Sequence, residues 1–205
     1  PSEGGPFPTV IVIHENRGLN PHIKDVARRM ALEGFLALAP DYLSDLGGTP
    51  ADEEAARGLF GQLQQADVTA NGVATIAWLQ GHEKSNGKVG AIGFCWGGGT
   101  VNDLAVASPD LLAAVPYYGR QPNPEAVAQI EGRIMAHYGG LDGRINAGIA
   151  AFEEALKAAG TDYQIFVYEG ANHAFNNDTS AARYDKEAAD LAWNRTVAFF
   201  KETLG

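Results

Sequence analysis

One cysteine lies where a nucleophile is expected. Residues 93–97 (GFCWG) follow an apolar run at 89–92, which predicts a buried strand, and precede small apolar residues at 97–107, which predict a tightly packed helix. This context is typical of a nucleophile elbow, G-x-S-x-G, with cysteine in place of serine. The outer glycines let the strand and the helix approach closely. Because a helix N-terminus favours negative charge, the sequence also predicts a stabilised thiolate at Cys95.

A lone cysteine also fits a plainer role as a small buried hydrophobic residue. A cysteine nucleophile needs a base, and the base needs an orienting acid. Asp142 and His173 follow Cys95 in the order nucleophile, acid, histidine, each directly after a predicted strand. Alone, Asp142 fits a turn or cap and His173 an exposed loop residue. All three at strand ends, in this order, predict a Cys95–Asp142–His173 triad.

The elements that must position these residues alternate along the chain. Strands are predicted at 10–13, 35–39, 88–94, 113–118, 134–138 and 163–168, and helices at 23–33, 51–63, 67–80, 97–107, 145–159 and 186–204. This alternation predicts an α/β fold with a mostly parallel sheet and helices on both faces. Sites in such sheets form at the carboxyl ends of the strands. Two segments rich in turn formers, 42–50 and 119–124, are candidate loops over the site.

The composition narrows the class of protein. The chain has 205 residues, 45% hydrophobic and 20% charged, which predicts one globular domain over 1–205. A net charge of −10 argues against nucleic acid as a partner. The single cysteine excludes an internal disulfide framework and a multi-thiolate metal site. No apolar run approaches the roughly 20 residues that span a bilayer, so we expect no membrane partner.

The chain begins at Pro1 without an initiator methionine and leads directly into a predicted strand. This start leaves room for N-terminal strands of the sheet, and for a targeting segment, that precede Pro1 in the native protein. We expect a cytoplasmic location, with a periplasmic or secreted one as the alternative if such a segment was removed. We expect a monomer or a small homo-oligomer.

Several motifs, spread over essentially the whole chain, resemble those of the dienelactone hydrolase family, which is carboxymethylenebutenolidase-like and belongs to the α/β-hydrolase superfamily. The motifs are residues 14–18 (HENRG), 39–42 (APDY), 93–98 (GFCWGG), Asp142 and 172–175 (NHAF). The resemblance implies an α/β-hydrolase fold and the Cys95–His173–Asp142 triad. It also implies that Glu15 contacts the resting thiol and helps the thiolate form when substrate binds.

The resemblance further implies an oxyanion hole made by the backbone N–H groups of Asn16 and Trp96. The residues agree, since Trp96 follows the nucleophile and Asn16 follows an early strand, where such donors are expected. The role of Glu15 is harder to explain from physics alone. A carboxylate beside a thiolate raises the pKa of the thiol unless it accepts the proton or moves away. The alternative for Glu15 is an ion pair with Arg17 or Arg120.

One position departs from the family pattern. Members that cleave dienelactone are expected to bind the substrate carboxylate with arginines, one of them a few residues after the catalytic histidine. Here Asn177 and Asp178 occupy that segment. Asn177 donates hydrogen bonds without carrying charge, and Asp178 would repel an anion. Four other arginines are candidate replacements, with a solvated surface position as the alternative for each: Arg17, Arg57, Arg120 and Arg144.

Aromatic residues near strand ends or covering loops are candidate pocket residues, with packing in the core as the alternative: Tyr42, Phe60, Trp96, Tyr117, Tyr118 and Phe175. We expect six residues to bind substrate: Tyr42, Tyr118, Phe175, Asn177, Arg17 and Arg120. His14 beside Glu15 suggests a metal site, but no histidine pairs with a carboxylate at a metal-binding i, i+4 spacing. No G-x-G-x-x-G opens a helix after the first strand. We therefore expect neither a metal nor a cofactor.

The sequence predicts an enzyme that hydrolyses a lactone or a small carboxylic ester through an acyl-thioester on Cys95. The missing arginine favours one alternative, a broad carboxylesterase or phosphotriester hydrolase that acts on neutral esters. A second alternative is a non-catalytic protein that binds a small molecule on a hydrolase scaffold.

Overall fold

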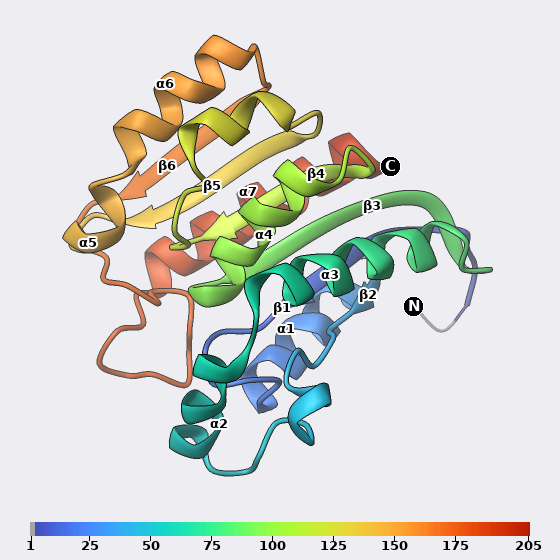
Figure 1. Cartoon of the computed structure of the whole chain (residues 1–205), viewed down its shortest axis with the longest axis horizontal. Coiled ribbons are helices and arrows are strands. Elements are labelled where there is room, and N and C mark those ends of the chain that lie inside the picture. The colour runs from blue at the N-terminus through green and yellow to red at the C-terminus, as the bar shows by residue number, and fades with distance from the viewer. Residues whose placement is uncertain (1–2) are drawn as a thin grey trace.

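The computed structural model describes residues 3–205, in which six parallel strands form one twisted sheet (Figure 1). The spatial order is β2-β1-β3-β4-β5-β6. The first strand thus lies next to the edge strand β2, and from β3 onward each new strand is added toward the opposite edge of the sheet. The strands are β1 (Phe7–Ile13), β2 (Leu36–Leu38), β3 (Ser85–Phe94), β4 (Leu111–Tyr117), β5 (Arg133–Gly139) and β6 (Tyr163–Tyr168). Because all six run the same way, their carboxyl ends share one edge of the sheet.

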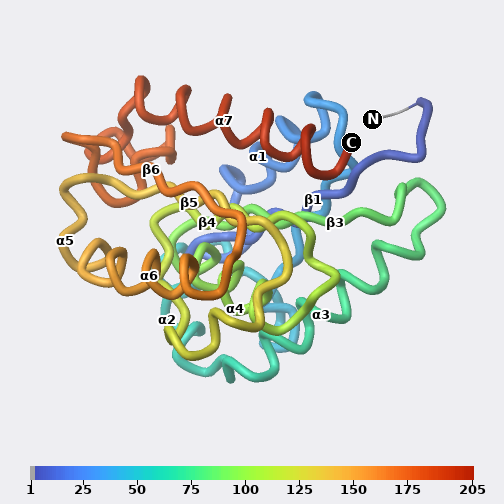
Figure 2. Tube along the Cα trace, turned by 90° about the horizontal axis from the view of Figure 1, so that it is seen from above, coloured from blue at the N-terminus to red at the C-terminus, as the bar shows by residue number. Residues whose placement is uncertain are grey.

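Helices cover both faces of this sheet. Figure 2 shows α1 (Pro21–Leu32) and α7 (Lys186–Leu204) on one face and α3 (Gln65–Gln80), α4 (Trp96–Ala107) and α6 (Ile149–Ala159) on the other. Two short helices, α2 (Glu53–Leu59) and α5 (Gly143–Asn146), lie at the carboxyl edge of the sheet, and 3-10 turns occur at Ser44–Leu46, Phe60–Gln62 and Pro124–Gln129. The predicted α/β fold class is confirmed.

The strands pack into two hydrophobic cores, one on each face. In β1, Val10 and Val12 contact the core beneath α1 and α7, whereas Ile11 and Ile13 contact the core beneath α3, α4 and α6. All four side chains are fully buried. Burial on both faces explains why the strand is a continuous run of β-branched residues rather than an alternation of apolar and polar ones.

Local signals account for the ends of the helices. Asn20 caps α1, since its Oδ1 accepts the N–H of Ile23 at 3.1 Å, and Pro21 occupies the first turn. Asp185 caps α7 in the same way through the N–H of Ala188 at 3.0 Å. Gly160 ends α6 in the left-handed conformation with φ 70°.

Some predicted boundaries were wrong. The single helix predicted at 145–159 is interrupted, because α5 ends at Asn146 and α6 begins at Ile149. The side chain of Asn146 donates to the carbonyl of Gly139 at 2.8 Å, which binds the short helix to the end of β5. The helix predicted at 51–63 ends as an α-helix at Leu59 and continues as a 3-10 turn. No helix among residues 3–205 has the length and apolar character required to cross a membrane.

Candidate active site

The candidate nucleophile lies in a strained turn between β3 and α4. Cys95 has φ 56° and ψ −111°, a conformation that non-glycine residues rarely adopt. Its N–H donates to the carbonyl of Tyr117 at 3.0 Å, which fixes the turn against β4. A Cβ atom at Gly97 would lie 2.5 Å from the carbonyl oxygens of Ile13 and His14. Only glycine therefore lets α4 start this close to β1, as the elbow pattern requires.

Asp142 and His173 meet at the same edge of the sheet. Asp142 follows β5, and its Oδ1 accepts the N–H of Ile145 at 3.3 Å. Its Oδ2 is hydrogen-bonded to Nδ1 of His173, a residue in the loop after β6. Because a carboxylate accepts, Nδ1 carries the proton, which leaves Nε2 of His173 free to act as a base. The ring of Tyr118 lies beside the imidazole, with 5.1 Å between ring centroids.

A cleft of about 300 Å³ opens at this edge of the sheet. Cys95 and His173 both line it, and so do Asn16 and Trp96, the two expected donors to an oxyanion. The remaining lining residues are Phe60, Gln65, Thr100, Tyr118, Arg120, Arg144 and Ile145. The cleft thus combines a thiol, an imidazole, backbone donors, aromatic surface and two arginines.

The thiol of Cys95 rests in its protonated form. Burial, and next the negative charge of Glu15, raise its pKa to about 11. The backbone N–H of Trp96 and the charge of Arg144 act in the opposite direction and are outweighed. The start of α4 thus acts in the predicted direction, but burial and a neighbouring carboxylate outweigh it, so the resting site does not hold the thiolate that the sequence predicts.

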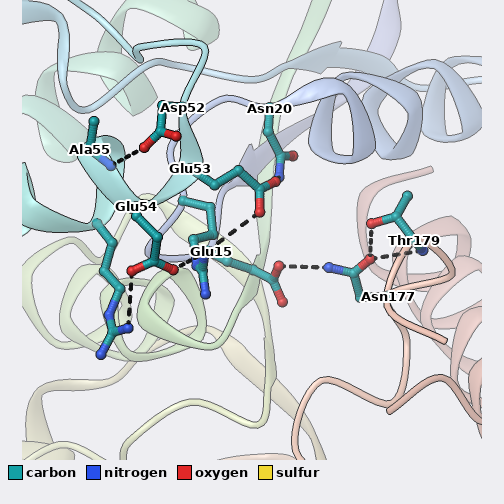
Figure 3. A network of polar contacts seen from close by, with 10 residues as sticks. Glu15, Asn20, Asp52, Glu53, Glu54, Ala55, Asn177 and Thr179 are labelled. Carbon is teal, nitrogen blue, oxygen red and sulfur yellow. Dashed lines mark hydrogen bonds and ion pairs between the residues drawn. The ribbon is translucent and has the colours of Figure 1, made fainter. Parts of the chain in front are cut away.

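Glu15 is itself buried, with 6% of its surface exposed. Its Oε2 accepts a hydrogen bond from Nδ2 of Asn177 at 2.9 Å (Figure 3). Burial raises the pKa of this carboxyl, and the hydrogen bond from Asn177 partly offsets the rise. The alternative expected for Glu15 was an ion pair with Arg17 or Arg120, and the structure shows neither. Arg17 pairs with carboxylates of α2, and Arg120 pairs with Asp103.

His14 supports the backbone of Glu15 from behind the cleft. Its Nε2 accepts the backbone N–H of Tyr42 at 3.1 Å, so Nδ1 must carry the proton and donate to the carbonyl of Glu15 at 2.8 Å. Burial lowers the pKa of His14, which keeps the imidazole neutral. The ring stacks on Trp96 with 5.5 Å between centroids. Both of its nitrogens are occupied, which leaves no lone pair for a metal. Residues 3–205 contain no cluster of three His, Cys, Asp or Glu side chains suited to a metal ion.

The six expected substrate-binding residues divide into two groups. Tyr118 and Arg120 line the cleft. The other four are not among the residues that line it: Tyr42 packs edge-on against Trp96, Phe175 is buried against Tyr118, Asn177 bonds to Glu15, and Arg17 pairs with Glu54 at 2.8 Å.

Several residues of the site were not predicted from the sequence. Gln65, Thr100 and Ile145 line the cleft from the starts of α3, α4 and α5, and nothing in their local sequence indicated it. Thr179 is different. Its N–H and hydroxyl both donate to Oδ1 of Asn177, at 3.0 and 2.6 Å. An Asn followed two residues later by a donor is a recognisable turn signal, so this contact was open to prediction.

A parallel sheet with a strained Cys95 elbow and a histidine–carboxylate pair at its carboxyl edge defines an enzyme of the α/β-hydrolase fold. Comparison with known proteins gives the family. The sequence pattern of the "Dienelactone hydrolase family" matches residues 1–204. The chain belongs to this family and is an ester or lactone hydrolase.

Individual relatives agree over nearly the whole chain. A "putative carboxymethylenebutenolidase" of Methylorubrum extorquens is 34% identical, covering 98% of this chain and 74% of that protein. The crystal structure of a "putative dienelactone hydrolase" from Klebsiella pneumoniae is 31% identical with a TM-score of 0.89, covering 98% and 90% of the two chains. A dienelactone hydrolase-like promiscuous phosphotriesterase from metagenomic libraries is 27% identical with a TM-score of 0.84, covering 99% and 89%.

Proposed function

We propose that this chain hydrolyses a lactone or a small carboxylic ester through a thioester on Cys95. The observation that carries the proposal is the strained turn that presents Cys95 to the same cleft as His173. The hydrogen bond from His173 to Asp142 supports it, because this bond leaves the other ring nitrogen available as a base.

Acylation begins when substrate enters and Glu15 accepts the thiol proton. The sulfur of Cys95 then bonds to the carbonyl carbon, and the N–H groups of Asn16 and Trp96 stabilise the negative oxygen. Each such donor typically lowers the barrier by about 2.7–4 kcal/mol. The C–O bond of the ester breaks, and the departing oxygen takes from Glu15 the proton that came from the thiol. The raised pKa of Glu15 suits this exchange, because a carboxyl group that is easier to protonate accepts a thiol proton more readily.

Deacylation uses His173. Its free nitrogen takes a proton from water, and the resulting hydroxide attacks the thioester carbon. The C–S bond breaks, the acid product leaves, and the imidazolium returns its proton to sulfur.

A second candidate is hydrolysis of neutral esters or phosphotriesters by the same residues. It is favoured by the charge of the cleft. Asp103 neutralises Arg120, and residues 174–178 contain no arginine, whereas members of the family that cleave dienelactone are expected to have one a few residues after the catalytic histidine. One of the relatives above is named a promiscuous phosphotriesterase. Arg144, however, lines the cleft without an ion-pair partner among residues 3–205, and it favours an anionic lactone.

The test compares initial rates on dienelactone and on a neutral p-nitrophenyl ester for the wild type, Cys95→Ala and His173→Ala. We expect Cys95→Ala to be inactive and His173→Ala to accumulate an acyl-enzyme that mass spectrometry detects on Cys95. Full activity in Cys95→Ala would refute the mechanism. Activity on the neutral ester alone would select the second candidate, and inactivity of the wild type on both would favour a binding protein.

A further inference from the structure

We propose that Asn177 is a positioning residue that holds the carboxylate of Glu15 in place, and that this protects the resting thiol of Cys95 from electrophiles between turnovers. The inference rests on the proposed function, since it concerns the resting state of the proposed nucleophile. It assigns a role to an uncharged side chain four residues beyond His173.

The amide of Asn177 is fixed at both ends. Its Oδ1 accepts the N–H and the hydroxyl of Thr179, so the amide group cannot turn over without losing two hydrogen bonds. The NH2 end must therefore face Glu15, which Figure 3 shows at the other end of the same chain of contacts. The backbone is fixed too, because the N–H of Asn177 donates to the carbonyl of Ala174 at 3.0 Å. Asn177 is 8% exposed, so water competes little for these bonds.

This arrangement acts on one particular carboxylate. Asn177 lies four residues beyond His173, whereas Glu15 follows β1 at the other end of the chain. The hydrogen bond thus joins the loop of the candidate base to the loop of the carboxylate whose charge raises the pKa of the thiol most. A donor to a carboxylate stabilises its ionised form, and an ionised Glu15 opposes ionisation of Cys95.

Several charged or titratable groups face Glu15 from the elements packed around it. Arg183, in the segment before α7, and Arg17, in the loop after β1, favour the ionised carboxylate, whereas Glu53 of α2 opposes it. The thiol of Cys95 and the hydroxyl of Tyr118 complete this set. The contribution of Asn177 exceeds that of each arginine and differs from it in kind, because it is a direct hydrogen bond rather than a charge at a distance.

The sign of the effect follows from these contacts. Without the amide donor, the pKa of Glu15 rises further and the carboxyl is more often protonated near pH 7. A neutral Glu15 no longer repels the thiolate, so Cys95 ionises at lower pH. We expect Asn177→Leu to react with iodoacetamide at pH 7 roughly tenfold faster than the wild type, the factor that corresponds to one hydrogen bond to a charged group.

The experiment measures alkylation of Cys95 by peptide mass spectrometry from about pH 6 to pH 10. In Asn177→Leu the midpoint of the rate profile should move to lower pH. A merely loosened site would instead raise the rate by one factor at every pH. Thr179→Val removes one of the two donors to Asn177 and should shift the midpoint in the same direction, whereas Thr179→Ser keeps the hydroxyl and should match the wild type.

A double-mutant comparison isolates the partner. Glu15→Gln should also speed alkylation, and adding Asn177→Leu to it should produce little further change, because the two residues act through one contact. Wild-type profiles in both Asn177→Leu and Thr179→Val would overturn the proposal, as would full additivity with Glu15→Gln. Alkylation does not depend on turnover, so these outcomes differ from failure of the proposed function, which appears as ester hydrolysis by Cys95→Ala.

Discussion

Asp142 contacts His173 with one carboxylate oxygen and begins a helix with the other. Oδ2 accepts from Nδ1 of the imidazole, and Oδ1 accepts the N–H of Ile145 in the first turn of α5. The cap holds the carboxylate in a single orientation, so the orientation of the imidazole is determined by the start of a short helix. One oxygen of Asp142 thus contacts the candidate base and the other caps a helix, so substitutions can test the two roles separately.

Asp142→Asn should keep the cap and lose the function. Asparagine is as good an N-cap as aspartate, so we expect the free energy of unfolding to change by less than about 0.5 kcal/mol. Its NH2 group cannot accept the proton of Nδ1, which leaves the imidazole in the wrong tautomer. In a serine-protease triad the same change lowers kcat about 10⁴-fold, and we expect a loss of similar order. Ester turnover and urea unfolding check both parts.

Asp142→Ala is the matched control. It should lose turnover to the same extent and, in addition, about 0.5–2 kcal/mol of unfolding free energy, since the cap is removed. A turnover near the wild-type value in Asp142→Asn would show that this carboxylate does not orient the base.

The two arginines of the cleft should differ in their effect on charged substrates. Arg144 has no ion-pair partner among the described residues, whereas Arg120 pairs with Asp103. We expect Arg144→Ala to lower kcat/KM for an anionic lactone by up to about fivefold, because an exposed charge pair contributes up to about 1 kcal/mol. A neutral ester should be unaffected.

Arg120→Ala should have a smaller effect on kcat/KM for the anionic lactone relative to the neutral ester. Asp103→Asn should increase the preference for the anionic substrate, because it frees Arg120. Equal losses of kcat/KM on neutral and anionic substrates in Arg144→Ala would mean that this residue shapes the cleft and does not recognise the charge of the substrate.

The sequence predicted the parts of the site that depend on local pattern. The β-branched runs predicted buried strands, and the glycines around Cys95 predicted the elbow, because a close helix–strand approach excludes larger residues. Asp142 and His173 were found for the same reason, since each follows a strand. The bond between Glu15 and Asn177 could not be found in this way, because it joins residues 162 positions apart whose meeting depends on how the loops fold.

The protonation state of Cys95 in the resting site could not be predicted from the sequence either. The start of α4 favours a thiolate, and the local pattern shows only that. Burial of Cys95 and the approach of Glu15 reverse the sign, and both arise from packing of distant segments. Interruption of the predicted helix 145–159 has a similar origin, since Asn146 bonds to the end of β5 and ends the first turn there.

Two glycines of α4 offer a matched test of the elbow. A Cβ atom at Gly97 would meet the backbone carbonyls of Ile13 and His14, which cannot move without distorting β1. At Gly99 it would meet Cγ of Arg120 at 2.9 Å, a flexible side chain that can shift. We expect Gly97→Ala to cost about 1–3 kcal/mol of unfolding free energy or more, and Gly99→Ala clearly less. Thermal or urea unfolding of the two variants decides, and equal losses would contradict the close approach at Gly97.

Acid stability should depend on a histidine outside the cleft. His137 of β5 is fully buried, and its two ring nitrogens bond to the hydroxyls of Tyr168 at 2.9 Å and Thr196 at 3.1 Å. Burial, and next the charge of Arg195, lower its pKa to about 3 from the usual 6.5. The imidazole therefore remains neutral in the folded protein, whereas the unfolded chain takes up a proton as the pH falls below about 6.5.

Since the unfolded state binds more protons in this window, the stability contributed by a neutral His137 is complete above about pH 6.5 and is lost as the pH falls toward 3. The loss is about 1.4 kcal/mol per pH unit. We expect His137→Gln, which does not titrate, to be less stable than the wild type at pH 7 by about 1–3 kcal/mol. On acidification its free energy of unfolding should fall by about 1.4 kcal/mol less per pH unit than that of the wild type. Urea unfolding of both proteins at pH 7 and about pH 5 measures the two slopes. Other buried histidines, such as His14, contribute equally to both slopes, so the difference isolates His137; equal slopes would show that this imidazole is protonated in the folded state.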